Sequence, residues 1–167
     1  MSVLPAETER LAAELGQLLL RKKTSITTAE SCTGGGIAYA LTATPGSSAY
    51  VDRGFVTYSN KAKQQLLGVK SATLLQFGAV SEQTVHEMAV GAQQAAGAGV
   101  AVAVSGIAGP GGGSEQKPVG TVWFAFAVDA HVVTTRWLFH GDRASIRAQA
   151  IDFALQQLIL LLTVQTD

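Results

Sequence analysis

The feature that most constrains the fold of this sequence is the apolar run Val100–Val104, which no polar residue interrupts. A strand with one face in water alternates apolar and polar residues, so an unbroken run predicts a strand that is covered on both faces. Helices packed on both sides of a sheet are the usual cover. The run therefore favours an α/β fold.

The rest of the chain is predicted to supply helices that alternate with strands. In the first part of the chain we expect a helix from Pro5 to Arg21–Lys23, a strand over Thr24–Ala29 and a helix over Ile37–Thr42. A strand over Asp52–Tyr58, a helix from Asn60 through Leu67, a short apolar segment over Leu74–Phe77 and a helix that begins after Ser81 are expected next. The last part of the chain is predicted to form a hairpin of Thr121–Val128 and His131–Phe139 and a final helix capped by Asp142. We therefore predict an α/β protein with three α/β/α layers, a mostly parallel (mixed) sheet and a C-terminal antiparallel hairpin. Residues 1–167 are expected to form a single domain.

Composition excludes several classes of function. Twelve basic residues balance twelve acidic ones, so no overall field attracts nucleic acid or an anionic membrane. The single cysteine, Cys32, excludes an internal disulfide and a cysteine-rich zinc site, and the three histidines show no metal-ligand spacing. From this composition we expect no metal and no cofactor. The N-terminus lacks the pattern of a signal peptide, so we expect a cytoplasmic protein.

Small polar residues at the end of the first predicted strand mark a candidate site. Ser31 lies where this strand turns into a helix through Thr33, Gly34 and Gly35. The unpaired N–H groups of such a turn favour a phosphate or a developing oxyanion. Ser31 could act as a nucleophile there, or Ser31 or Thr33 could simply cap the helix.

A serine nucleophile needs a base, and no suitable histidine is present. Lys61 and Tyr58 follow the second predicted strand, whose end we expect beside that of the first. Lys61 could accept the serine proton if its pKa is lowered, with Tyr58 relaying or orienting that proton. Alternatively, Lys61 is a solvated lysine and Tyr58 a half-buried strand aromatic.

The third predicted strand ends in a glycine-rich loop, Ser105–Gly113. No P-loop and no dinucleotide-binding glycine pattern occurs in it. The loop could hold a phosphate with its N–H groups, or it could be a flexible connector. Arg143 and Arg147, four residues apart on the last helix, share a face and could bind an anion. The predicted substrate-binding residues are Thr33, Gly34, Gly35, Ser105, Gly106, Gly109, Gly111, Gly112, Arg143 and Arg147.

These segments resemble the CinA C-terminal domain family in its stand-alone amidase form. The matching segments are TAESCTGG at 28–35, GFVTYSN at 54–60, GAVS at 78–81, SGIAGPGGG at 105–113 and KPVGTV at 117–122. The resemblance implies hydrolysis of the carboxamide of nicotinamide mononucleotide to nicotinate mononucleotide and ammonia, and hence recycling of pyridine nucleotides. It also implies Ser31 as the nucleophile, with Lys61 and Tyr58 as its activating partners.

Two other classes of function remain open at this stage. The domain could be a non-catalytic nucleotide-binding module, which the nucleotide would stabilise without releasing ammonia. It could also be a structural partner domain that does neither. We expect a small-molecule nucleotide substrate as the partner, with no nucleic acid and no membrane, and leave a homodimer open.

Overall fold

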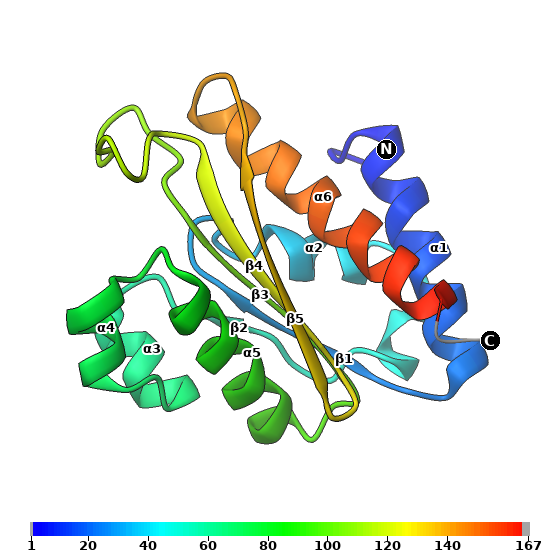
Figure 1. Ribbon diagram of the computed structural model, residues 1–167. Coiled ribbons are helices and arrows are strands. Elements are labelled where there is room, and N and C mark those ends of the chain that lie inside the picture. The colour runs from blue at the N-terminus through cyan, green and yellow to red at the C-terminus, as the bar shows by residue number, and fades with distance from the viewer. Residues whose placement is uncertain (1, 165–167) are drawn as a thin grey trace.

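The computed structural model describes residues 2–164, which form a mixed sheet with helices on both faces (Figure 1). The helices are α1 (Ala6–Lys22), α2 (Gly36–Thr42), α3 (Asn60–Leu67), α4 (Ser71–Phe77), α5 (Glu82–Ala96) and α6 (Arg143–Val164), with a 3₁₀ turn, η1 (Ser47–Ala49). The strands are β1 (Ile26–Glu30), β2 (Phe55–Val56), β3 (Val100–Gly106), β4 (Thr121–Val128) and β5 (His131–Leu138). The predicted three-layer α/β architecture is confirmed. No helix in the described range is long and apolar enough to cross a membrane.

The strand order is β2-β1-β3-β4-β5. Strand β1 pairs in parallel with both β2 and β3, whereas β3 pairs antiparallel with β4, and β4 with β5. The mixed sheet with a late hairpin was therefore predicted correctly. Because β2, β1 and β3 are parallel neighbours, their carboxyl ends lie at one edge of the sheet.

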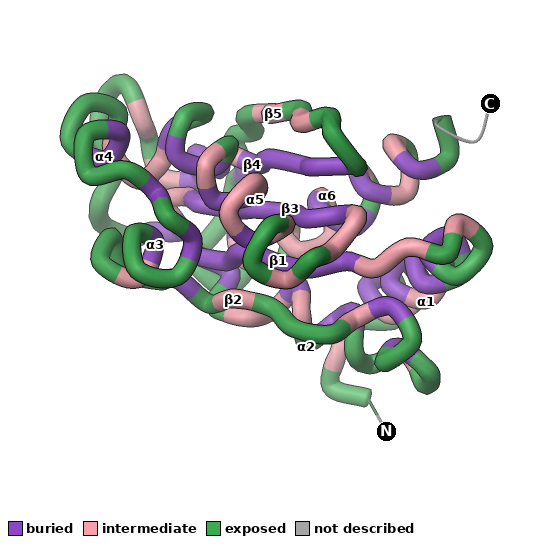
Figure 2. Tube along the Cα trace, turned by 90° about the horizontal axis from the view of Figure 1, so that it is seen from below, coloured by how far each residue is buried: buried purple, intermediate pink, exposed green. Residues whose placement is uncertain are grey.

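Side-chain size alternates along β3 and decides how each face is covered. Val100, Val102 and Val104 pack into the cluster formed with α1, α2 and α6. Ala101 and Ala103 face the opposite cluster, which α5 and its neighbours cover. Small residues on that face allow α5 to lie close to the sheet. Figure 2 shows that β1, β3 and β4 are buried, whereas much of β5, at the edge of the sheet, is exposed.

The second strand is shorter than predicted. The sequence indicated a strand over 52–58, but only Phe55–Val56 pairs as β2. Before it, the Arg53 carbonyl accepts a hydrogen bond from Thr27 Oγ1 at 2.8 Å, outside the strand ladder. After it, the carbonyls of Thr57 and Tyr58 accept from a lysine side chain. The carbonyls on either side of β2 thus accept from side chains, and only the Thr57 amide continues the pairing, by donating to the Glu30 carbonyl at 2.8 Å.

Candidate active site

Ser31 lies directly after β1 in a tight turn that leads into α2. The Ser31 amide donates to the Val104 carbonyl at 3.0 Å, which continues the pairing of β1 with β3 by one residue. Gly34 and Gly35 then adopt φ values of +60° and +101°, which residues other than glycine rarely adopt. These two left-handed residues reverse the chain, so Ser31 is held at the carboxyl edge of the sheet.

A buried carboxylate organises this turn. Glu30 is fully buried, and its Oε1 accepts from Thr33 Oγ1 at 2.6 Å and from the Ile37 amide at 2.9 Å. Its Oε2 accepts from the Ala38 amide at 3.0 Å. Glu30 therefore satisfies the first N–H groups of α2, where a negative charge is also favoured by the helix dipole. No sequence pattern indicated this role for Glu30.

Two amides of the turn have no backbone acceptor. Gly34 donates to the Ser31 carbonyl and Gly36 to that of Thr33, both at 3.0 Å. The amides of Cys32 and Thr33 donate to no backbone carbonyl among residues 2–164. The N–H of the residue after a nucleophile is a common oxyanion donor. The Cys32 amide, which directly follows Ser31, is therefore the candidate oxyanion donor of this turn.

The side chain that contacts Ser31 is Lys63. Its Nζ donates to Ser31 Oγ at 2.9 Å and to the carbonyls of Thr57 and Tyr58 at 2.8 and 3.2 Å. Lys63 is 0% exposed, although lysine is almost never fully buried without a partner. Three acceptors for its three N–H groups explain how it is accommodated. The contact joins the end of β1 to α3.

Burial also changes the acid–base behaviour of this lysine. It lowers the pKa of Lys63 from 10.5 to about 8, because a buried ammonium loses its hydration. Among the described residues, no carboxylate forms an ion pair with it that would restore the usual value. A lysine with a pKa of about 8 is roughly 10% neutral at pH 7 and can accept a proton.

The prediction that Lys61 contacts Ser31 is wrong. Helix α3 is capped by Ser59, whose Oγ accepts from the Ala62 amide at 3.0 Å. In this helix Lys63 and Leu67 are buried, whereas Lys61 is exposed. Two residues correspond to about 200° around a helix, so Lys61 points to the opposite side from Lys63. The four-residue spacing of Lys63 and Leu67 was the sequence signal that could have revealed the buried lysine.

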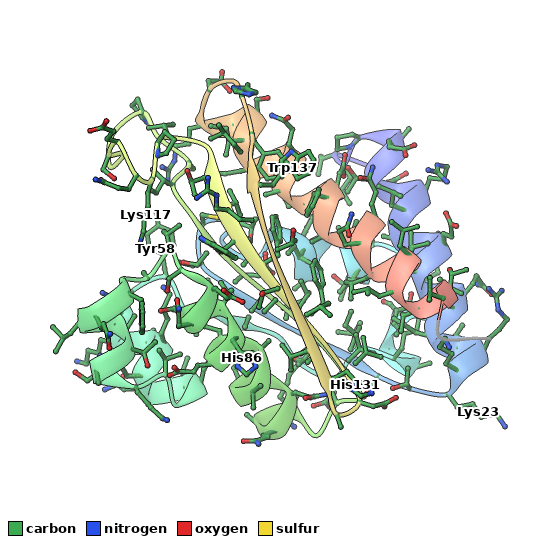
Figure 3. The ribbon with its side chains drawn as sticks, viewed as in Figure 1. Lys23, Tyr58, His86, Lys117, His131 and Trp137 are labelled. Atoms are coloured by element: carbon green, nitrogen blue, oxygen red, sulfur yellow. The ribbon has the colours of Figure 1, made fainter. Side chains whose placement is uncertain are left out.

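Tyr58 belongs to the site mainly through its backbone. Its carbonyl accepts from Lys63 Nζ, and also from Ser31 Oγ at 3.4 Å. The residue is 60% exposed, and its hydroxyl accepts from Arg143 Nη2 at 3.0 Å. The phenol is therefore not in contact with Ser31. The predicted relay of the Ser31 proton through the Tyr58 hydroxyl does not fit this geometry. In Figure 3, Tyr58 projects between the glycine-rich loop and the α3–α4 region.

Ser31 opens into a cavity of about 240 Å³. Its lining includes Ser31, Cys32, Tyr58, Lys63, Ala79, Val80, Ser105, Gly106, Ala108 and Arg143. Of the predicted substrate-binding residues, Ser105, Gly106 and Arg143 therefore lie at the cavity. Among the described residues no histidine lines it, and His86 and His131 lie on α5 and β5, away from Tyr58 (Figure 3).

The other predicted binding residues do not line this cavity. Thr33 is committed to Glu30, and Gly34 and Gly35 form the turn. Gly109 lies outside the lining, and its carbonyl accepts from Arg143 Nη1 at 2.8 Å. Gly111 and Gly112 are exposed, and the loop between β3 and β4 that contains them projects beyond the sheet (Figure 1). Only the start of the predicted phosphate-binding loop therefore lies at the cavity, because the loop leaves the sheet edge after Ala108.

Arg147 and Cys32 support the turn from behind. Arg147 Nε donates to the Cys32 carbonyl at 3.0 Å, which ties α6 to the turn. The Cys32 side chain is buried, as expected for a structural thiol, and burial raises its pKa to about 11. Such a thiol stays protonated at neutral pH and is a poor nucleophile. Ser31, rather than its neighbour Cys32, is therefore the nucleophile candidate.

Replacing Glu30 by glutamine tests the support of this turn. One amide oxygen cannot accept all three donors, and the new NH₂ faces an N–H, so we expect unfolding free energy to fall by about 1–3 kcal/mol. Urea unfolding curves measure this loss. Glu115→Gln, in the exposed loop, is the matched control and should have no measurable effect. Equal stabilities of the two variants would contradict the capping role of Glu30.

A parallel sheet edge that carries a buried serine–lysine pair defines an α/β protein with a site suited to serine chemistry. Residues 8–162 match the model of the CinA C-terminal domain. The chain belongs to this family.

Similar proteins cover almost the whole chain. It is 62% identical to the nicotinamide-nucleotide amidohydrolase PncC of Enterobacter agglomerans, over 87% of this chain and 90% of that protein. It is 56% identical to the protein of the same name from Escherichia coli (strain K12), over 92% and 93%. The crystal structure of the competence/damage inducible protein CihA from Agrobacterium tumefaciens superposes with a TM-score of 0.93 at 49% identity, covering 96% of this chain and 99% of that chain.

Proposed function

We propose that this protein hydrolyses the carboxamide of nicotinamide mononucleotide to nicotinate mononucleotide and ammonia, and so serves pyridine nucleotide recycling. The substrate is taken from the names of the similar proteins, and the chemistry rests on one observation in this chain. That observation is the 2.9 Å contact between Lys63 Nζ and Ser31 Oγ in a buried site. A base within hydrogen-bonding distance of a hydroxyl is what an activated serine requires.

In the first half of the reaction, neutral Lys63 takes the proton from Ser31 as Oγ attacks the carboxamide carbon. The electron pair of the C=O bond moves to oxygen, and the N–H group of Cys32 stabilises this oxyanion. The Lys63 ammonium then gives its proton to the nitrogen as the C–N bond breaks. Ammonia leaves, and the nicotinoyl group remains as an ester on Ser31.

The second half repeats these steps with water. Lys63 accepts a proton from water as the water oxygen attacks the ester carbon. It then returns a proton to Ser31 Oγ as the ester bond breaks. The carbonyls of Thr57 and Tyr58 keep Lys63 Nζ in place throughout both halves. Arg143 supplies a positive charge at the cavity for the substrate phosphate.

Ammonia release from nicotinamide mononucleotide by the purified protein tests this proposal. We expect stoichiometric ammonia and nicotinate mononucleotide, and no ammonia from nicotinate mononucleotide itself. A non-catalytic nucleotide-binding module would instead show a raised melting temperature with the nucleotide and no ammonia. That result would refute the proposed activity.

The pH dependence of turnover provides a separate test of the base. Only the neutral amine accepts a proton, so kcat should rise as pH increases through the lowered Lys63 pKa of about 8. Between pH 7 and pH 9 the neutral fraction grows roughly tenfold, and kcat should grow with it before reaching a plateau. A rate that is constant between pH 6 and 9, or that continues to rise steeply above pH 10, would be inconsistent with this assignment.

A further inference from the structure

A second hollow of about 280 Å³ lies next to the Ser31 cavity. Val80 lines both, so only the short α4–α5 connection separates them. Phe77 at the end of α4, Trp123 of β4 and Arg136 of β5 contribute to its walls, together with Lys117 of the loop before β4. None of these side chains has a role in the proposed hydrolysis.

Two cations in this hollow have no acidic partner. Lys117 Nζ donates to the Phe77 carbonyl at 2.7 Å, and Arg136 is exposed without a hydrogen bond among the described residues. The ion pairs of the described chain involve other residues. One carboxylate also lines the hollow: Glu82, whose Oε1 accepts from Thr134 Oγ1 at 2.8 Å. The balance is one positive charge, which favours an anionic ligand.

An aromatic surface accompanies these cations. Trp123 is partly buried against the α5 cluster and lies directly opposite Arg136 in the β4–β5 register. Directly paired residues share a face of the sheet, so the indole and the guanidinium line the same hollow. An indole offers stacking area to a planar ring, whereas a guanidinium can hold a phosphate with two N–H groups.

We propose that this hollow binds a nucleoside monophosphate unit, with its base against Trp123 and its phosphate toward Lys117 and Arg136. The unit could be a free nucleotide or the second half of a dinucleotide whose other half enters the Ser31 cavity across Val80. In both cases the recognised chemistry is the same. This site goes beyond the proposed hydrolysis and does not depend on it, because its ligand needs no carboxamide.

Calorimetric titration with adenosine monophosphate tests the site. We expect binding that weakens about tenfold or more in Arg136→Gln, since a charge-assisted hydrogen bond to phosphate is lost. Arg21→Gln, an exposed cation on α1, is the matched control and should bind normally. Adenosine and inorganic phosphate, which each lack half of the ligand, should bind at least tenfold more weakly. Turnover of nicotinamide mononucleotide should be unchanged in Arg136→Gln.

Tryptophan fluorescence locates the ligand. The chain has two tryptophans, and Trp137 packs against Phe153 of α6 on the other face of the sheet, with ring centroids 5.3 Å apart. Bound nucleotide should quench Trp123, so quenching should vanish in Trp123→Phe and persist in Trp137→Phe. Absence of binding, or an affinity that neither Trp123→Phe nor Arg136→Gln lowers, would overturn the proposal.

Two arms distinguish the source of the ligand. If the unit is half of a dinucleotide, nicotinamide adenine dinucleotide should bind more tightly than adenosine monophosphate, and Arg143→Gln should weaken only the dinucleotide. If the unit is a free nucleotide, the two ligands should bind alike and Arg143→Gln should affect neither. Either pattern supports the site, provided that Arg136→Gln weakens binding.

Discussion

Lys63→Met is expected to lower kcat by about 10²–10⁴-fold, which is the contribution typical of a general base. Methionine matches the length of the lysine stem and suits a buried position, but it cannot accept a proton. Release of ammonia from nicotinamide mononucleotide, measured at saturating substrate, gives kcat directly. The melting temperature of the variant shows whether the fold is retained.

Lys61→Met is the matched control for this experiment. Lys61 lies two residues away on the same helix but is exposed, so its removal should leave kcat within about twofold of the original. The two variants remove the same charge from the chain, and only one of them removes the group in contact with Ser31. A large loss in Lys61→Met together with normal activity in Lys63→Met would refute the proposed mechanism.

Ser31→Ala should reduce ammonia release to the background rate, because the attacking oxygen is absent. The variant should remain folded, although leaving one buried Lys63 N–H without its acceptor costs about 1–3 kcal/mol. Nucleotide binding should persist, as the cavity and Arg143 are unchanged. Calorimetric titration with nicotinamide mononucleotide therefore provides the internal control.

The separation of binding from turnover makes this result specific. A variant that binds the nucleotide but releases no ammonia identifies Ser31 with the chemical step. A variant that releases ammonia at the original rate would exclude Ser31 as the nucleophile, and water activated directly by Lys63 would then be the alternative. Loss of both properties together with an unchanged melting temperature would indicate that the Ser31 hydroxyl contributes to substrate binding.

Local sequence patterns predicted most of the architecture. The apolar run Val100–Val104 indicated a strand covered on both faces, and this strand forms β3. Asp142 was expected to cap the last helix, and its Oδ1 accepts from the Ser145 amide at 2.9 Å. These features depend on neighbours within about four residues along the chain, which is why periodicity and capping signals reveal them.

The position of Ser31 could also be predicted, because it follows from the order of strand, turn and helix. Parallel pairing of β1 with β2 and β3 then brought the expected strand ends together. The sequence did not indicate that Glu30 would cap α2. A carboxylate is rarely fully buried, and only the turn formed by Gly34 and Gly35 brings the α2 amides back to Glu30 at the end of β1.

The sequence by itself determined the class of fold, the location of the nucleophile candidate and the family resemblance. The tertiary structure decided which lysine contacts Ser31. A Cβ at Gly91 of α5 would lie 1.9 Å from the Leu67 carbonyl, so α3 packs on α5 at a contact that only glycine permits. That packing turns the Lys63–Leu67 side of α3 inward and leaves Lys61 in solvent. The rotation of a short helix about its axis depends on burial against a distant element, and short-range sequence patterns do not encode it strongly.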